Sequence, residues 1–274
     1  LPAMPASEQK SWEQAVAFYR EHMLKLDFVD DEQMARIDSY LAKMENVPAI
    51  SGEVIGNDVA RVLTSAAPVY KQYWWPRQDM ANQFWISMVQ PLLASLGDQI
   101  RKQLVTAYEA EWPAKLIRVD VSVYANWGGA YTNVDPRGQV HTVMSSIDSG
   151  NQGFAAIETL FHEASHGIVD GETGKLGEAI QTQAKAQGIP VPDNLWHALI
   201  FYTVGEFARR DLDRVGVHDY QPYADKQGLW ARSWPTYRPA LALFWQAHMD
   251  GRLSLNDAVS EIMKALAVID GKHN

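Results

Sequence analysis

The sequence contains two histidines four residues apart, His162 and His166, and a glutamate directly after the first of them. On a helix, this spacing separates two side chains by about 40° of rotation and about 6 Å of rise, so both imidazoles can reach one metal ion. The carboxylate of Glu163 lies about 100° around the same helix from His162. We therefore expect it beside such an ion, where it can accept a proton from a bound water molecule.

The residues around this motif have the period of an amphipathic helix. Apolar residues recur at helical spacing and form the stripe Ile157, Leu160, Phe161, Ala164 and Ile168. A second row, away from that stripe, consists of Glu158, His162, His166 and Asp170. We expect one face to pack and the other to face a cleft, with Gly171 ending the helix. The alternative is a pair of surface histidines beside a solvated glutamate.

The ten residues from Thr159 to Ile168 resemble the extended signature of the zincin superfamily of zinc metallopeptidases. That signature has a small or β-branched residue, an uncharged residue, any residue, His-Glu, two uncharged residues, a second His, an uncharged residue and a hydrophobic one. Every position agrees. The resemblance implies one Zn2+ per chain, with His162 and His166 as ligands and Glu163 as the general base.

The third zinc ligand depends on the branch of the superfamily that the chain resembles. The metzincin pattern has a glycine three residues after the second histidine and a further histidine three residues later, where this chain has Val169 and Glu172. The gluzincin pattern takes a glutamate from a later helix. The resemblance to gluzincins favours Glu206 as the third ligand, with Glu178 and Glu172 as the alternatives.

Residues 193–212 have the pattern of the helix that would carry Glu206, because apolar residues recur in them at helical spacing. A second interpretation of Glu206 is structural. Arg209 and Arg210 follow it by three and four residues, which is the spacing of ion pairs on a solvated helix face.

The composition changes after residue 115. Two alternating segments rich in β-branched residues, 116–125 and 139–147, predict strands. The sequence Asp-Pro-Arg-Gly at 135–138 predicts a turn between them. A small sheet is therefore expected ahead of the histidine helix.

The segment Trp127–Asn133, between the two predicted strands, contains two adjacent glycines. It resembles the substrate-binding edge strand of gluzincins, with Gly129, Ala130 and Tyr131 as the residues that would contact a substrate. An open sheet edge offers unpaired N–H and C=O groups to an extended peptide, and glycine lets another backbone approach closely. The alternative is an irregular hairpin whose glycines serve turn geometry.

Three potential hydrogen-bond donors, His218, Tyr220 and Tyr223, follow the helix that would carry the third ligand. In gluzincins a His or Tyr from this part of the chain commonly stabilises the tetrahedral oxyanion, a role that needs a neutral or cationic donor near the metal. We select Tyr223 as the second catalytic residue, with Tyr220 and His218 as alternatives. Each of them could instead be a loop or packing residue.

The composition restricts partners and compartment. The 274 residues are 47% hydrophobic, which suffices for one large domain or two closely packed lobes. The net charge of −9, without a Lys/Arg cluster, argues against nucleic acid as a partner. No apolar run approaches the roughly 18 residues of a membrane span, and the absence of cysteine excludes disulfides and Cys-ligated zinc. The run Leu1–Ser7 suits a trimmed export signal, which favours a periplasmic or secreted protein over a cytoplasmic one.

These patterns predict an α+β fold that is predominantly helical. Residues 1–115 would form a helical N-terminal lobe, in which Asp31 precedes one amphipathic helix and Asp79 opens a long apolar helix interrupted by Pro91. Residues 116–274 would form a zincin-like metallopeptidase domain with a small mixed sheet and the histidine helix.

The expected function is zinc-dependent hydrolysis of a peptide or protein substrate. Glu163 would take a proton from the attacking water and return one to the leaving amine. Two alternatives remain open. The chain could be a catalytically inactive zincin-fold binding module, or a zinc hydrolase that acts on a non-protein amide or a cell-wall component.

Overall fold

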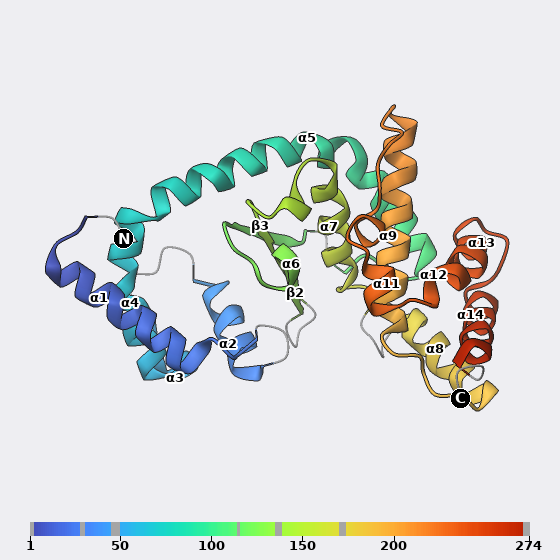
Figure 1. Cartoon of the computed structure of the whole chain (residues 1–274), viewed down its shortest axis with the longest axis horizontal. Coiled ribbons are helices and arrows are strands. Elements are labelled where there is room, and N and C mark those ends of the chain that lie inside the picture. The colour runs from blue at the N-terminus through green and yellow to red at the C-terminus, as the bar shows by residue number, and fades with distance from the viewer. Residues whose placement is uncertain are drawn as a thin grey trace.

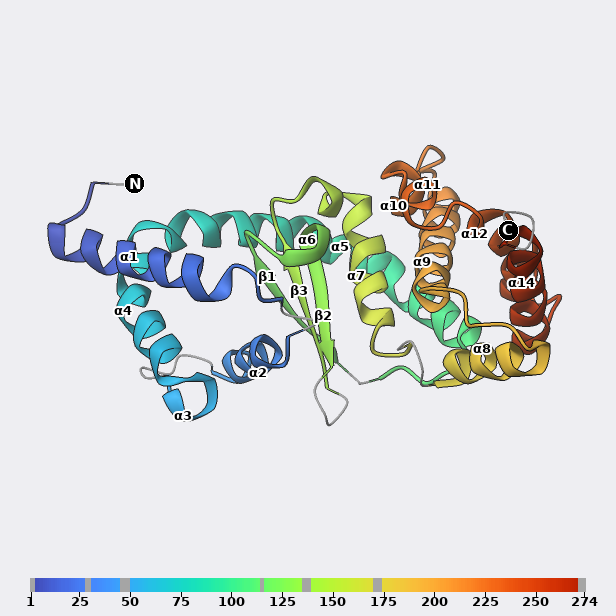
Figure 2. The same ribbon diagram turned by 60° about the horizontal axis from the view of Figure 1, so that its bottom comes forward.

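The computed structural model describes residues 3–27, 31–44, 50–113, 116–134, 139–169 and 174–270. The chain is predominantly helical, with one small mixed sheet between two groups of helices (Figures 1 and 2). This confirms the predicted α+β class. The expected turn at 135–138, Gly171 and Glu172 lie outside the described residues.

The N-terminal helices surround a small apolar core of their own. They are α1 (Ala6–Phe18), its π-helical continuation (Tyr19–Met23), α2 (Glu32–Leu41), α3 (Gly52–Ile55) and α4 (Asn57–Tyr73). Asp31 caps α2 by accepting a hydrogen bond from the backbone N–H of Met34 at 2.9 Å, so this helix begins where the sequence predicts. The core consists of Met23, Met34, Ile37, Ile55, Val59 and Ala60.

A single long helix, α5 (Trp75–Ala107), connects these helices to the rest of the chain (Figure 1). It begins before Asp79 and continues through Pro91, so the prediction of an interruption there is wrong. Proline removes one helical hydrogen bond. Val89 and Leu96, on either side of Pro91, are both buried in the same apolar core, and this packing keeps the helix continuous.

Three strands form the sheet in the order β1-β3-β2. They are β1 (Arg118–Ser122), β2 (Ala130–Val134) and β3 (Val140–Ser145), and one helical turn, α6 (Asn126–Gly129), precedes β2. β1 is parallel to β3, whereas β2 is antiparallel to it, with Thr132 opposite Thr142. The two predicted strand segments thus contain β1 and β3. The segment expected to form an edge strand contains all of β2 except Val134, and β2 lies at one edge of the sheet.

The C-terminal helices pack around α7 and α9. They are α7 (Phe154–Ser165), α8 (Gly174–Gln187), α9 (Leu195–Arg214), α10 (Tyr223–Lys226), α11 (Leu229–Ser233), α12 (Tyr237–Ala240) with its π-helical continuation (Leu241–Trp245), α13 (Gln246–Met249) and α14 (Leu255–Asp270). Figure 2 shows α7 between the sheet and α9. In the described ranges, no helix is long and apolar enough to cross a membrane.

The larger apolar core begins within α5. It takes side chains from α5 from Trp85 onward, from α7, α8 and α9, and from the C-terminal helices. The predicted boundary at residue 115 follows α5 in the chain, whereas the second half of α5 packs with the helices that come after that boundary. Residues before 115 therefore support α7 directly.

The N-terminal helices contact the sheet through polar groups centred on Asp38 of α2. Its carboxylate accepts hydrogen bonds from the Tyr131 hydroxyl at 3.1 Å and from the Asn133 amide at 2.8 Å. His141 of β3 lies between two carboxylates, with Nδ1 3.2 Å from Asp38 and Nε2 3.0 Å from Asp120 of β1. Burial alone would lower the pKa of His141, but the hydrogen bonds to Asp120 and Asp38 raise it to about 9. The imidazole is therefore protonated at neutral pH and bridges α2 to the sheet.

We predict that raising the pH destabilises the wild-type protein through His141. A histidine whose pKa is higher in the folded than in the unfolded state contributes its full stability below the unfolded pKa of about 6.5. This contribution is lost as the pH rises through the folded value of about 9. The urea unfolding midpoint of wild type should therefore fall more steeply over this pH range than that of His141→Gln. The variant His218→Gln, at an exposed histidine, serves as the control and should keep the wild-type slope. Equal slopes for wild type and His141→Gln would contradict the assignment.

Candidate metal centre

α7 carries His162 and Glu163 and ends at Ser165, directly before His166 and short of the end predicted at Gly171, and it is buried on almost every side. Nine of its twelve residues are buried. Leu160 and Phe161 face the core, as expected from their spacing. Two residues of the row expected to face a cleft, Glu158 and His162, are also buried, and His162 and Glu163 are each 6% exposed; Asp170 lies outside the described residues. Their polar atoms therefore depend on partners within the protein.

His197, in the first turn of α9, adds a third imidazole to the pair on α7. The side-chain nitrogens of His162, His166 and His197 that could hold a cation lie within 4.8 Å of one another. Nε2 of His162 and Nε2 of His197 are 3.2 Å apart. The three rings are separated pairwise by 5.1 to 5.2 Å between centroids.

The separation of the His162 and His197 nitrogens fits two ligands of a tetrahedral metal ion. Two ligands at the usual Zn–N distance of about 2.05 Å are about 3.3 Å apart in a tetrahedron, close to the 3.2 Å between His162 and His197. Burial lowers the pKa of His162 well below its ordinary value, that of His166 to about 4 and that of His197 to about 3. The imidazoles are therefore neutral at pH 7, with lone pairs available to a cation. Three imidazoles and an open fourth position are typical of catalytic zinc.

Aromatic rings enclose the three histidines. Phe201 lies 4.0 Å from His162 between ring centroids, and Trp196 stacks on His197 at 5.0 Å. Trp234 contacts the edge of His197 at 5.8 Å. Nδ1 of His162 is buried and has no hydrogen-bond partner among the described residues, so no neighbouring acceptor fixes the tautomer of this ring.

Two of the glutamates considered as third ligand, Glu206 and Glu178, lie elsewhere, and Glu172 is outside the described residues. Glu206 is nine residues beyond His197 on α9, about 13.5 Å along the helix axis. Its Oε2 accepts a hydrogen bond from Arg209 at 2.7 Å and lies 3.9 Å from Arg210, which is the structural arrangement considered for it. Glu178 is exposed on α8. His197 thus takes the place expected for Glu206 in the candidate ligand set.

His197 is absent from the ligands predicted from the sequence. It is the single histidine of α9, and Phe201 lies one turn further on the same face. That pattern is a weak signal, because a lone histidine beside apolar residues more often packs than binds metal. Its contact with α7 depends on how two helices pack, and sequence spacing does not show this.

Glu163 is held by a threonine of β2, which in turn contacts a threonine of β3. Its Oε2 accepts a hydrogen bond from the Thr132 hydroxyl of β2 at 2.9 Å, and the Thr132 and Thr142 hydroxyl oxygens are 2.9 Å apart. Burial raises the pKa of Glu163 to about 7, and the hydrogen bond from Thr132 opposes this rise. The carboxylate predicted as general base thus follows the candidate ligand His162 on α7 and is directed to the edge strand β2.

A buried carboxylate one turn before His162, that of Glu158, anchors the chain segment ahead of α10. It accepts hydrogen bonds from the Tyr220 hydroxyl and from the backbone N–H of Tyr223 at 2.9 and 3.0 Å. Gly205 of α9 leaves room for this contact. A Cβ there would lie 2.8 Å from Pro222 and 3.2 Å from Glu158.

The three predicted oxyanion donors are placed differently. His218 is exposed and pairs with Asp213 at 2.6 Å, and the Tyr220 hydroxyl is bound to Glu158. Tyr223 stacks on Phe201 at 6.0 Å, and Phe201 in turn contacts His162. Burial raises the pKa of Tyr223, so its hydroxyl remains a hydrogen-bond donor at neutral pH.

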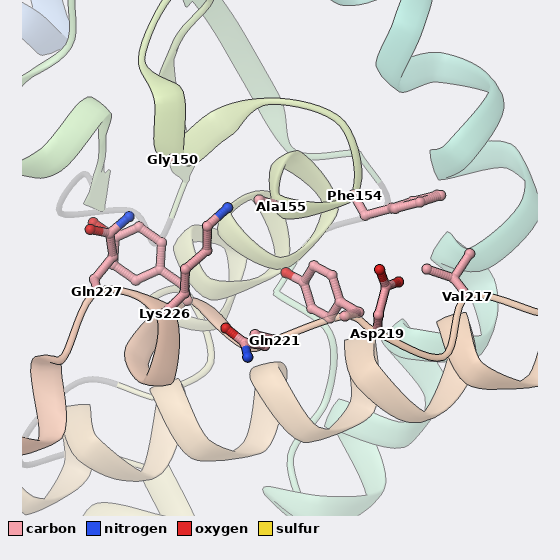
Figure 3. Close-up of a pocket in the computed structure, with 10 residues that line it drawn as sticks. Gly150, Phe154, Ala155, Val217, Asp219, Gln221, Lys226 and Gln227 are labelled. Atoms are coloured by element: carbon pink, nitrogen blue, oxygen red, sulfur yellow. The ribbon is translucent and has the colours of Figure 1, made fainter.

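A cavity of about 360 Å³ adjoins Tyr223. Figure 3 shows it between the start of α7, at Phe154 and Ala155, and the segment from Val217 to Gln227. Lys226 extends from α10 toward Ala155. The volume of the cavity is within the range of small-ligand sites, about 300–1,000 Å³.

The residues predicted to contact substrate lie at the start of β2. The carbonyl of Gly129 accepts a hydrogen bond from the Asn151 amide at 2.6 Å. Ala130 is buried in the larger core, and the Tyr131 side chain points to Asp38 on the opposite face. What this segment can offer a substrate is therefore backbone along the outer edge of β2, which pairs with no other strand in the described part of the chain.

Comparisons with known proteins identify no relative. No protein-family model matches the chain, and no curated protein or solved structure matches it. The functional hypothesis consequently rests on the residues and distances described above.

We predict that zinc binding depends on His197 and not on Glu206. In His197→Ala one of three converging nitrogens is lost, and affinity for zinc should fall by at least about 100-fold. Glu206→Gln removes the carboxylate that pairs with Arg209 and Arg210 and should bind zinc as wild type does. Zinc per chain measured by elemental analysis, with titration of the metal-free protein, checks both. Loss of zinc from Glu206→Gln with retention in His197→Ala would reverse the ligand assignment.

Proposed function

We propose that the chain is a zinc-dependent peptidase of the zincin type, in which His162, His166 and His197 hold one Zn2+. The observation that carries this proposal is the convergence of three imidazole nitrogens, one of them from the residue directly before the buried Glu163. The position of β2, antiparallel at a sheet edge next to α7, supports a zincin-like arrangement of residues 116–274. A histidine as third ligand departs from the gluzincin pattern, so the proposal extends to the zincin type alone.

The proposed reaction is hydrolysis of a peptide bond. When bound, zinc supplies Lewis acidity, which polarises a carbonyl and makes water acidic enough to react near neutral pH. Glu163 accepts a proton from the water that attacks the carbonyl carbon and donates a proton to the amine nitrogen as the C–N bond breaks. The products are a carboxylate and an amine.

Tyr223 is proposed to stabilise the negative charge that develops on the carbonyl oxygen. A neutral hydroxyl placed before the reaction begins is an effective donor, because it needs no reorganisation when the charge appears. Glu158 fixes the backbone of Tyr223, and Phe201 supports its ring. These contacts hold the tyrosine beside the aromatic wall of the histidine cluster.

The substrate is proposed to be an extended peptide that pairs with the outer edge of β2. Main-chain hydrogen bonds to an open strand bind a peptide largely irrespective of its sequence. The cavity between α7 and α10 offers room for a substrate side chain next to Tyr223.

Glu163→Gln tests the reaction. Gln cannot accept and release a proton as a carboxylate does, so hydrolysis of a mixed peptide library should fall by about 1,000-fold or more. Zinc should stay near one per chain, whereas His166→Ala should lose both zinc and activity. Glu178→Gln, on the exposed face of α8, is the matched control and should match wild type. Retained hydrolysis in pure Glu163→Gln protein would contradict the mechanism.

The same assay separates the alternatives. A wild-type protein that binds zinc and leaves every peptide intact would favour an inactive binding module. Turnover of a cell-wall amide with all peptides intact would favour a hydrolase of non-protein substrates.

Tyr223→Phe tests the oxyanion donor. Loss of one hydroxyl at the developing charge should lower kcat by about 100-fold, while KM and zinc content stay near the wild-type values. Tyr124→Phe, at a tyrosine that is 75% exposed, serves as the control. An unchanged kcat in Tyr223→Phe would remove Tyr223 from the mechanism.

A further inference from the structure

Two threonines on neighbouring strands form a directed pair of hydrogen bonds that ends at Glu163. A hydroxyl group has one proton to donate. The proton of Thr132 goes to Oε2 of Glu163 at 2.9 Å, so the contact of 2.9 Å between the two hydroxyls requires Thr142 to donate to Thr132. The pair is directly cross-strand in the register of β2 and β3.

These hydrogen bonds matter because the groups that they join are buried. Thr142 has no exposed surface, and Glu163 is almost fully enclosed. A buried carboxylate needs donors to offset its loss of water. Among the described residues, Thr132 supplies that hydrogen bond to Oε2 of Glu163. The other oxygen, Oε1, then remains available to accept and donate the proton of the reaction.

We infer that Thr132, oriented by Thr142, is a positioning residue that fixes the carboxylate of Glu163 for proton transfer. This inference rests on the proposed function. It adds a coupling to it, because Thr132 is the central residue of β2, the strand proposed to pair with the substrate backbone. One strand therefore aligns the substrate with its edge and the base with a side chain. A displacement of β2 would change the position of the bound peptide and the distance from Thr132 to Glu163 together.

Substitution of Thr132 by valine and by serine distinguishes the effect of its hydroxyl group from the effect of its shape. Thr132→Val keeps the branched shape and removes the donor, so kcat should fall by about tenfold while KM changes by less than about twofold. Thr132→Ser restores the donor and should recover most of kcat. Thr142→Val leaves the bond to Glu163 in place but removes its orientation, so its kcat should lie between wild type and Thr132→Val. Zinc content should be unchanged in all three.

A second readout requires neither zinc nor activity. In the metal-free protein, urea unfolding midpoints of wild type, Thr132→Val, Glu163→Ala and the double variant form a double-mutant cycle. Thr132→Val should lower the midpoint clearly in the wild-type background, where it leaves a buried carboxylate without its donor. In the Glu163→Ala background the shift should be much smaller.

The outcomes are distinguishable. A kcat of Thr132→Val within twofold of wild type, or no recovery in Thr132→Ser, overturns the positioning role. An additive cycle overturns the contact itself. A wild-type protein that binds zinc and cleaves no peptide overturns the proposed function, and in that case the cycle still reports whether Thr132 holds Glu163.

Discussion

The burial of α7 requires that its polar side chains find hydrogen-bond partners within the protein, and the candidate site depends on these partners. A polar group removed from water must find a partner in the protein, or the fold loses stability. α7 carries two carboxylates and an imidazole into the interior, and a different element meets each of them. The segment before α10 meets Glu158, β2 meets Glu163, and α9 meets His162 with the imidazole of His197. The hydrogen-bond partners that the buried side chains of α7 require therefore bring three elements to this helix: β2, α9 and the segment before α10.

Two kinds of contact hold the chain together. The larger core joins α5, α7, α8 and α9 by apolar packing, which is strong and has little directional preference. The N-terminal helices have a separate small core and meet the sheet through Asp38, His141 and Asp120. Hydrogen bonds between these charged groups have defined directions, so they fix the orientation of α2 relative to the sheet. The sheet is thus supported on one face by packing and located on the other by a charged cluster.

The histidine helix and the strands β1 and β3 could be predicted because their signals are local. Period 3.6 in one segment and alternation in two others need no knowledge of the rest of the chain. Asp31 could be predicted as the residue before a helix, now α2, for the same reason. Pro91 shows the limit, since its unfavourable effect on a helix is outweighed by packing on both sides, which no local pattern reports.

The third imidazole could not be predicted by such means. His197 follows His166 by 31 positions in the sequence, and their proximity is set by the way α7 and α9 pack. The preference for Glu206 came from a family resemblance, and in the structure that residue pairs with Arg209. Local chemistry suffices to recognise the pair on one helix, whereas completing the set requires the tertiary structure.

The register of β2 against β3 has a consequence for the site. Side chains along a strand alternate between faces, so a slip of one residue would reverse every side chain of β2. Thr132 would turn away from Glu163, and a neighbour on the strand, Tyr131 or Asn133 according to the direction of the slip, would take its place. Both of these side chains now reach Asp38. The alignment of a five-residue strand is therefore as much a part of the candidate active site as the histidines themselves.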